Sequence, residues 1–263
     1  MAPLSALASR LAAAWRSRGV IDGVRPEEVP LSREEAYAVQ DRMVEAIGEP
    51  VTGWKVGATS AKMRELDGHD DVIPGRLLAP TTFCGSSQQL DIAQFPRARL
   101  EAEFAFRINA DLSPRAAPHD PGEIGQIVTL HPAMEIIADR YPRGAGHPDI
   151  GTLLTIADNG GGIGFVAGDP VFEYSNVDFH QHHVALTVNG GPESDNFLGE
   201  MRCSPLQVLT DLVNALGVRG IGLEAGQFVT TGAAAVPVHV EPGCRIRADF
   251  GGLGDIEVVF SSP

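Results

Sequence analysis

Residues 99–106 alternate between charged and apolar side chains, and this pattern constrains the fold more than any other in the chain. Arg99, Glu101 and Glu103 take one parity, and apolar residues take the other. A β-strand places alternate residues on one face, about 6.5 Å apart along the backbone. The pattern therefore predicts a strand on which Glu101 and Glu103 lie side by side.

Two neighbouring carboxylates need an explanation wherever they are partly buried. At a separation of about 4 Å and an effective dielectric constant of about 20, they repel by about 4 kcal/mol. Such a pair persists only if one group is protonated or a cation lies between them. The alternative is a half-exposed strand whose glutamates are simply solvated.

A second apolar run, residues 131–138, carries Glu135 at its middle. A carboxylate in such a run is rarely buried unless it is paired or ligated. Three carboxylates without adjacent Cys or His suit a hard cation rather than zinc. The sequence therefore predicts a site for Mg²⁺ or Mn²⁺ made by Glu101, Glu103 and Glu135.

The two lysines, Lys55 and Lys62, stand out because every other basic residue is Arg. Lysine can release its proton and arginine cannot, so a retained lysine indicates proton transfer. In the strand expected over residues 51–57, Gly53 and Gly57 share a face with Lys55 and leave space beside its amine. The alternatives are chance retention of the lysine and an edge strand where glycine relieves crowding.

Composition excludes several classes of function for this chain of 263 residues. A net charge of −14 argues against nucleic acid and anionic membranes. No apolar run approaches the ~20 residues of a membrane span. The N-terminal segment reads as a helix rather than a signal peptide, because Arg10 interrupts it and no basic region precedes it. Three widely spaced cysteines fit a reducing cytoplasm.

The order of elements predicts helices before a strand-rich body. Apolar stripes indicate helices over residues 4–15, ending near Gly19, and 36–47, which a Ser32–Glu35 capping box precedes. Residues 58–95 read as a short helix and then loop, 149–157 and 205–216 as helices, and the chain from 227 on as short strands. We expect an N-terminal region over 1–75, with the first strand and a substrate loop, and a catalytic body over 76–263, forming one structural unit.

Two motifs are rejected on their context. Gly162 and Gly164 match a loose dinucleotide fingerprint, but no helix signal follows them. His180, His182 and His183 lie after a polar loop and read as solvated side chains.

The motifs occur in an order that resembles one enzyme family. They are residues 53–59, the Glu101–Glu103 strand, residues 132–136, residues 156–160, and the stretch from Thr231 to residue 258. This order is similar to the 2-keto-4-pentenoate hydratase and 4-oxalocrotonate decarboxylase branch of the fumarylacetoacetate hydrolase superfamily. The resemblance implies an α+β fold, a mixed β-roll with an N-terminal helical region, and a homo-oligomer.

The resemblance also implies roles for particular residues. The same three glutamates would hold Mg²⁺ or Mn²⁺, and Lys55 would stand beside the substrate as a proton shuttle. Substrate contacts are expected at Val56, Gly57, Asp158, Asn159, Gly160 and Thr231.

The chain departs from the hydratase pattern at two places. Gly160 and Gly161 follow Asp158-Asn159, where hydratases usually have Ala-Ser. Val72, Ile73 and Pro74 precede Gly75, where hydratases carry an acid. We expect Asp70 or Asp71 to replace that acid, with the loop 69–75 folded over the metal beside Lys55.

The expected activity is that of a metal-dependent lyase acting on a small 2-hydroxy-dienoate or 2-oxo acid. Hydration to a 4-hydroxy-2-oxo acid is the first expectation. The alternatives are a decarboxylase of a vinylogous 2-oxo diacid, a hydrolase of acylpyruvate C–C bonds, and a catalytically inactive family member.

Overall fold

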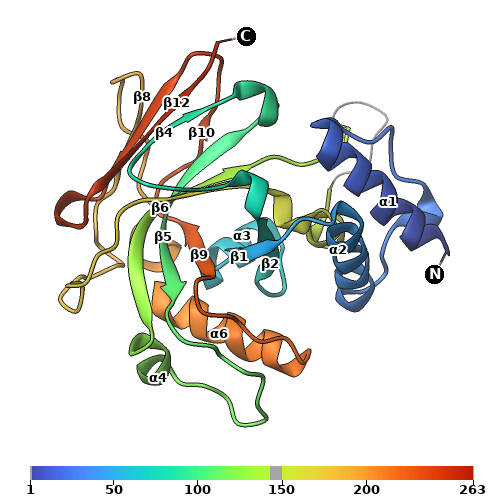
Figure 1. Ribbon diagram of the computed structural model, residues 1–263, viewed down its shortest axis with the longest axis horizontal. Helices are drawn as coiled ribbons and strands as arrows, with labels where there is room; N and C mark the ends of the chain where they lie inside the picture. The colour runs from blue at the N-terminus through green and yellow to red at the C-terminus, as the bar shows by residue number, and fades with distance from the viewer. Residues whose placement is uncertain (1, 143–149, 263) are drawn as a thin grey trace.

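The computed structural model describes residues 2–142 and 150–262 and shows an N-terminal pair of helices beside two β-sheets (Figure 1). The N-terminal helices α1 and α2 lie at one end of the molecule, away from the smaller sheet (Figure 1). The helices are α1 (Ala2–Ser17), α2 (Arg33–Ile47), α3 (Ala61–Asp67), α4 (Pro121–Gly125), α5 (Thr152–Ala157) and α6 (Pro205–Val218). The expected start of the fifth helix at Asp149 lies outside the described residues. None of the described helices is long and apolar enough to cross a membrane.

The caps of the first two helices follow the sequence signals with small differences. The Ser32 hydroxyl accepts the Glu35 N–H at 3.2 Å, and the Glu35 carboxylate accepts the N–H of Leu31 rather than that of Ser32. Helix α1 ends one residue earlier than expected, because Arg18 and not Gly19 takes the left-handed conformation, with φ 55°. The Gly19 N–H then closes the end of the helix on the Ala14 carbonyl.

The apolar stripes of α1 and α2 are buried against each other and against the body. The cluster they form includes Leu7, Leu11, Trp15, Val39, Met43, Leu78, Tyr141 and Leu154. Both stripes therefore have partners within the chain itself.

The larger sheet has the order β2-β1-β9-β5-β6-β7-β3, and β10 pairs with β5 beyond this path. Its strands are β1 (Val51–Gly57), β2 (Ile73–Leu78), β3 (Thr82–Cys84), β5 (Arg99–Ile108), β6 (Val128–Ile137), β7 (Gly162–Ala167), β9 (Phe228–Ala233) and β10 (Val238–His239). The smaller sheet has the order β4-β12-β11-β8, with β4 (Ser87–Leu90), β8 (Ala185–Val188), β11 (Arg245–Asp249) and β12 (Asp255–Phe260). The main apolar core lies between the two sheets and α6, and Phe104, Phe250 and Leu209 are among its buried members.

Residues 58–95 differ most from expectation, since they hold β2, β3 and β4 as well as α3. The segment is short of regular apolar alternation, and β2 contains Pro74. A proline is tolerated there because β2 is the edge strand of its sheet. The division expected at residue 75 falls within β2 and remains a prediction.

The position of β1 depends on a close backbone contact. Gly53 has φ 154°, and a Cβ at this residue would lie 1.9 Å from the Phe228 carbonyl oxygen of β9. Only glycine allows β1 to run this close beside β9. The contact brings Lys55, two residues further along β1, into the same sheet as the strands that carry the three glutamates.

Candidate active site

The pairing of β5 with β6 brings the three glutamates together. Glu101 lies directly opposite Glu135 in the antiparallel ladder, and Glu103 stands two residues along the same face. One oxygen from each carboxylate lies within 4.8 Å of the others. Glu103 and Glu135 are buried, and Glu101 is half-buried. The structure therefore brings together the three residues that the sequence singled out.

Each buried carboxylate is fixed through one oxygen. Glu103 Oε2 accepts the N–H of Thr231 at 3.0 Å and that of Gly232 at 2.8 Å. Glu135 Oε2 accepts the Thr230 hydroxyl at 3.2 Å. By contrast, Glu103 Oε1 is buried without a hydrogen-bond partner. The second oxygen is thus available to a ligand while the first is fixed.

Lys55 is buried in the same cluster, with its Nζ 3.2 Å from Glu135 Oε1. Burial alone would lower the pKa of Lys55, but the charges of Glu135, Glu101 and Glu103 outweigh it and raise the pKa. A lowered pKa of Lys55, which would suit a proton shuttle, therefore requires a further positive charge beside the carboxylates.

The carboxylates themselves are difficult to ionise together. Burial, followed by the charge of Glu135, raises the pKa of Glu101 to about 7 and that of Glu103 well above its usual value. Three carboxylates and one ammonium leave two negative charges uncompensated when all four groups are ionised. A divalent cation balances that charge, and an all-oxygen donor set suits Mg²⁺ or Mn²⁺. The residues present thus fit a hard divalent ion.

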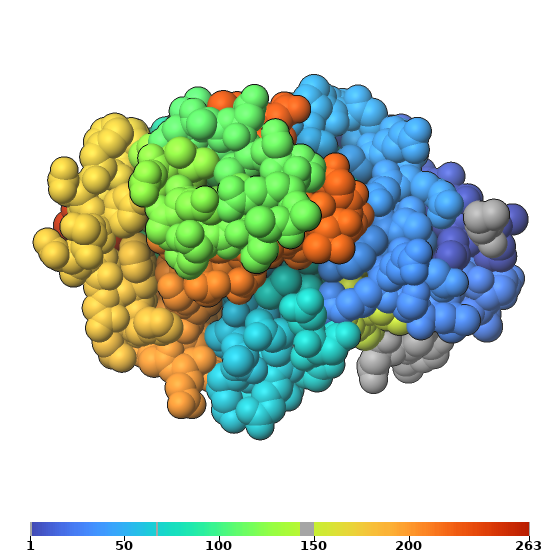
Figure 2. Space-filling model, turned by 90° about the horizontal axis from the view of Figure 1, so that it is seen from below, coloured from blue at the N-terminus to red at the C-terminus, as the bar shows by residue number. Residues whose placement is uncertain are grey.

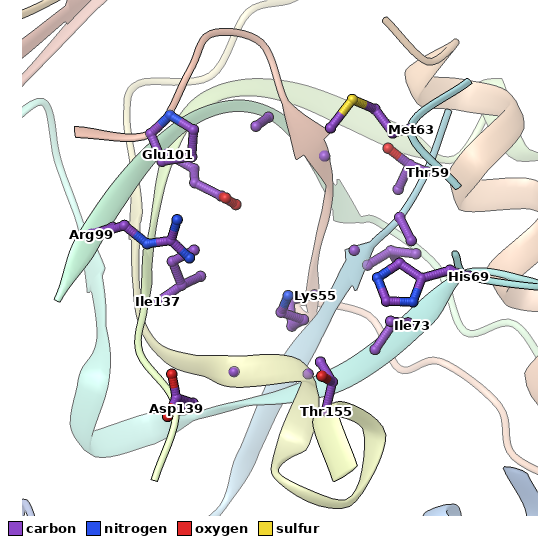
Figure 3. A pocket seen from close by; sticks show the side chains of 18 of the residues that line it. Lys55, Thr59, Met63, His69, Ile73, Arg99, Glu101, Ile137, Asp139 and Thr155 are labelled. Carbon is purple, nitrogen blue, oxygen red and sulfur yellow. The ribbon is translucent and has the colours of Figure 1, made fainter. Parts of the chain in front are cut away.

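The cluster opens into a cavity of about 400 Å³. Figure 3 shows Lys55 in its wall, Glu101 and Arg99 on one side, and His69, Thr59 and Met63 on the other. Val56 and Gly57 of β1, for which substrate contacts are expected, also line the cavity. A molecule in this space would meet the carboxylates, an ammonium and several apolar side chains at once.

The turn after α5 has a different role from the one expected for its side chains. Asp158 lines the cavity, but its carboxylate accepts from Arg140, at 2.6 Å from Nη1 and 2.7 Å from the backbone N–H. The Asn159 amide bonds the backbone of Arg76 in β2, accepting its N–H at 2.6 Å and donating to its carbonyl at 2.9 Å. Asn159 is not among the cavity-lining residues that the structure describes. Both side chains hold the turn in place.

Gly160 does face the cavity, with φ 63°. A Cβ at this position would lie 3.1 Å from Lys55 Cδ, so its absence leaves the lysine stem uncrowded. Thr231 holds a glutamate rather than facing the cavity, because its N–H donates to Glu103 and its hydroxyl donates to the Phe104 carbonyl at 2.6 Å.

The loop between α3 and β2 corrects the expectation for Asp70 and Asp71. Asp70 is exposed and pairs with Arg33 at 2.7 Å, and that hydrogen bond lowers its pKa. Asp71 is also exposed and accepts the N–H of Val72 at 2.7 Å. Neither lines the cavity, because Arg33 of α2 holds this part of the loop at the surface.

The same loop places His69 and Ile73 in the cavity wall instead. Sequence reasoning did not select His69 or Arg99. For Arg99 a signal was present, since it shares the parity of Glu101 on β5. For His69 no signal was present, because an irregular loop has no period from which the direction of a side chain can be predicted.

The three histidines near residue 180 are dispersed. His182 Nε2 bonds the Phe250 carbonyl at 2.9 Å, and exposed His183 pairs with Glu193 at 3.1 Å. Among residues 2–142 and 150–262, the three glutamates form the only cluster of potential metal ligands.

Comparisons with known proteins relate this chain to hydratases and decarboxylases. The chain is 30% identical over 214 residues to a 4-oxalocrotonate decarboxylase from Pseudomonas sp., covering 80% of this chain and 78% of the relative. It is 26% identical over 259 residues to a 2-keto-4-pentenoate hydratase from Paraburkholderia xenovorans (strain LB400), covering 97% and 94%. A scan against protein-family models gave no match.

Among solved structures, 4-oxalocrotonate decarboxylase from Pseudomonas putida G7, complexed with magnesium and adipate, superposes with a TM-score of 0.83. The two chains are 25% identical, with 98% of this chain and 97% of that chain covered. Other fumarylacetoacetate hydrolase family structures share the fold at lower identity. The fold is therefore that of fumarylacetoacetate hydrolase-like enzymes. Within that superfamily, the chain belongs to the 2-keto-4-pentenoate hydratase and 4-oxalocrotonate decarboxylase family.

The first prediction concerns Glu103. Glu103→Gln should keep the bonds from Thr231 and Gly232, since an amide oxygen also accepts, but it removes one negative charge from the donor set. We expect Mn²⁺ affinity, measured by isothermal titration calorimetry, to fall by more than about tenfold. Glu257→Gln, on β12 of the smaller sheet, is the matched control. Unchanged affinity in Glu103→Gln would contradict the site.

The second prediction concerns pH. Because the pKa of Glu101 is raised to about 7, a cation must displace a proton from it in more acidic solution. Mn²⁺ affinity should therefore increase from about pH 6 to about pH 8, approaching tenfold per pH unit for each proton displaced. Calorimetry in two buffers of different ionisation enthalpy would also report the released proton. An affinity independent of pH would show that the carboxylates are already ionised.

Proposed function

We propose that this protein is a metal-dependent lyase that hydrates a small 2-hydroxy-dienoate, through its 2-oxo tautomer, to a 4-hydroxy-2-oxo acid. The observation that carries the proposal is the convergence of Glu101, Glu103 and Glu135 beside Lys55. Lys55, Glu101 and Glu103 of this cluster line the cavity. The names of its relatives, hydratases and decarboxylases of such acids, support this class of substrate.

The three glutamates would hold Mg²⁺ or Mn²⁺ through one carboxylate oxygen each. The bound ion would supply a Lewis acid for the C1 carboxylate and C2 oxygen of the substrate. Lys55 would accept the proton of the C2 hydroxyl and return one to the far end of the dienol, which produces the 2-oxo-3-enoate. The Glu135 carboxylate, 3.2 Å away, orients the Lys55 amine for this transfer.

Decarboxylation of a vinylogous 2-oxo diacid is the second candidate, and Arg99 favours it. The guanidinium lies beside Glu101 in the cavity wall, where a second carboxylate could bind (Figure 3). Loss of carbon dioxide needs the same electron-accepting end of the substrate, without a positioned water.

An assay with two substrates separates the candidates. The protein with Mg²⁺ is given 2-hydroxy-2,4-pentadienoate and, separately, a 2-oxo-3-enedioate, and dienol absorbance and product mass are followed. Hydration of the first supports the proposal. Release of carbon dioxide from the second, without hydration of any dienoate, replaces it with the decarboxylase. No turnover of either, with Mg²⁺ bound, would indicate an inactive member.

The third prediction concerns Lys55. Lys55→Arg keeps the positive charge beside Glu135 but cannot release a proton, so turnover should be lost. Mn²⁺ affinity and the thermal midpoint of unfolding should stay close to the wild-type values, because the ion pair is retained. Lys62→Arg, on the exposed side of α3, is the control and should turn over normally. A near-normal kcat in Lys55→Arg would restrict Lys55 to an electrostatic role.

The fourth prediction concerns assembly. We propose a cytoplasmic homo-oligomer whose substrate is a small 2-oxo acid. The apolar stripes of α1 and α2 are buried within the chain, so they give no argument for assembly. Large apolar side chains elsewhere are exposed, among them Phe172 at 75% and Val218 at 91%. Light scattering at micromolar concentration should report a dimer or larger species. A monomer would contradict this part of the proposal.

A further inference from the structure

One titratable side chain of the cavity wall has no part in the chemistry above. The loop between α3 and β2 places His69 in the wall, with its ring on the opposite side of the cavity from Glu101 and Arg99 (Figure 3). Figure 2 shows this part of the surface, where α3 and the following loop, in cyan, lie between α6 in orange and the blue N-terminal segment.

The position of His69 is fixed from two helices. Its backbone N–H donates to the Arg64 carbonyl at 2.9 Å, where Gly68 ends α3 with φ 72°. Its ring Nδ1 lies 2.7 Å from the hydroxyl of Thr152, the first residue of α5. With Nδ1 engaged by Thr152, Nε2 is the nitrogen that can exchange a proton with a molecule in the cavity.

The charged groups around His69 are engaged elsewhere. Arg33 of α2 pairs with Asp70, and the Arg64 side chain donates to the carbonyls of residues 58 and 59. Across the cavity, Lys55 pairs with Glu135. Among residues 2–142 and 150–262 the ring has no ionic partner, and its hydrogen bond to Thr152 sets its orientation.

The neighbours of His69 in this loop and in β2 leave the cavity wall without another proton acceptor from this segment. Ile73, one of the three residues that precede Gly75 where hydratases of the family carry an acid, presents an apolar side chain to the same wall. Asp70 and Asp71 point outward. His69 is thus the group of this loop, among those that line the cavity, that can accept a proton.

We propose that His69 is the base that activates the water added to the substrate, a role that rests on the proposed hydratase function. Nε2 takes one proton from water, and the water oxygen forms a bond to C4 of the 2-oxo-3-enoate. The electron pair of the C3=C4 bond becomes a C2=C3 bond, and that of C2=O becomes a lone pair on oxygen. The proton taken by His69 passes through water to the Lys55 amine, which delivers it to C3 as the ketone re-forms. The net change is addition of H and OH across C3=C4.

Thr152 is a positioning residue in this arrangement. It contacts the ring rather than the substrate, so its hydroxyl acts only by orienting Nε2 toward the cavity. Thr152→Val should lower the rate of hydration, and Thr152→Ser should restore it, since serine keeps the hydroxyl.

The test separates proton transfer at the two ends of the substrate. His69→Gln, Asp70→Asn and the wild type are given 2-hydroxy-2,4-pentadienoate with Mg²⁺, and in a second assay 2-oxopentanoate in D₂O, where exchange at C3 reports Lys55 alone. His69→Gln should lose about 10²-fold or more in kcat for hydration, the usual scale for a positioned base, and keep C3 exchange near the wild-type rate. Asp70→Asn should retain both activities.

A spectroscopic measurement tests the location without turnover. The ring signals of ¹⁵N-histidine, with that of His69 assigned from the His69→Gln spectrum, should shift when 2-oxopentanoate binds with Mg²⁺. Two results would overturn the proposal: wild-type hydration by His69→Gln, or a ring signal that does not move with ligand. His69 would then have only a structural role, linking its loop to α5. A wild type that exchanges C3 but hydrates no dienoate would overturn the hydratase function itself, and the base role with it.

Discussion

Repulsion among three carboxylates is the constraint on which the active site depends. Glu101, Glu103 and Glu135 come from two paired strands, so the sheet itself forces them together. The surrounding chain offsets part of the cost through Lys55, the Thr230 hydroxyl and two backbone N–H groups. The rest must be offset by protonation or a bound cation. The same electrostatic demand that makes the site unfavourable when empty gives it affinity for a divalent ion.

The sequence predicted the elements whose side chains follow a regular period. Alternation located β5 and the convergent glutamates, and the capping signal at Ser32 located α2, because strand and helix periods are local properties. Gly53 and Gly57 indicated a special environment for Lys55. The structure gives the reason for Gly53, a backbone contact with β9 that no local pattern reveals.

The irregular segments were harder to predict, for a physical reason. Whether an acid in a loop faces a cavity depends on distant partners, and Arg33 of α2 decides it for Asp70. Asn159 likewise was read as a substrate ligand because of its motif, while its amide bonds the backbone of β2. Polar side chains in turns satisfy backbone groups as readily as ligands. Motif position alone therefore does not separate the two roles.

The Asn159 amide has a mechanical consequence. By accepting from and donating to the backbone of Arg76, it pairs with β2 as another strand would, so the turn carrying Gly160 and the edge strand carrying Ile73 behave as one rigid wall. That wall cannot widen without breaking two partly buried hydrogen bonds. The relative positions of Gly160 and Ile73 are therefore expected to stay fixed when a molecule enters or leaves the cavity.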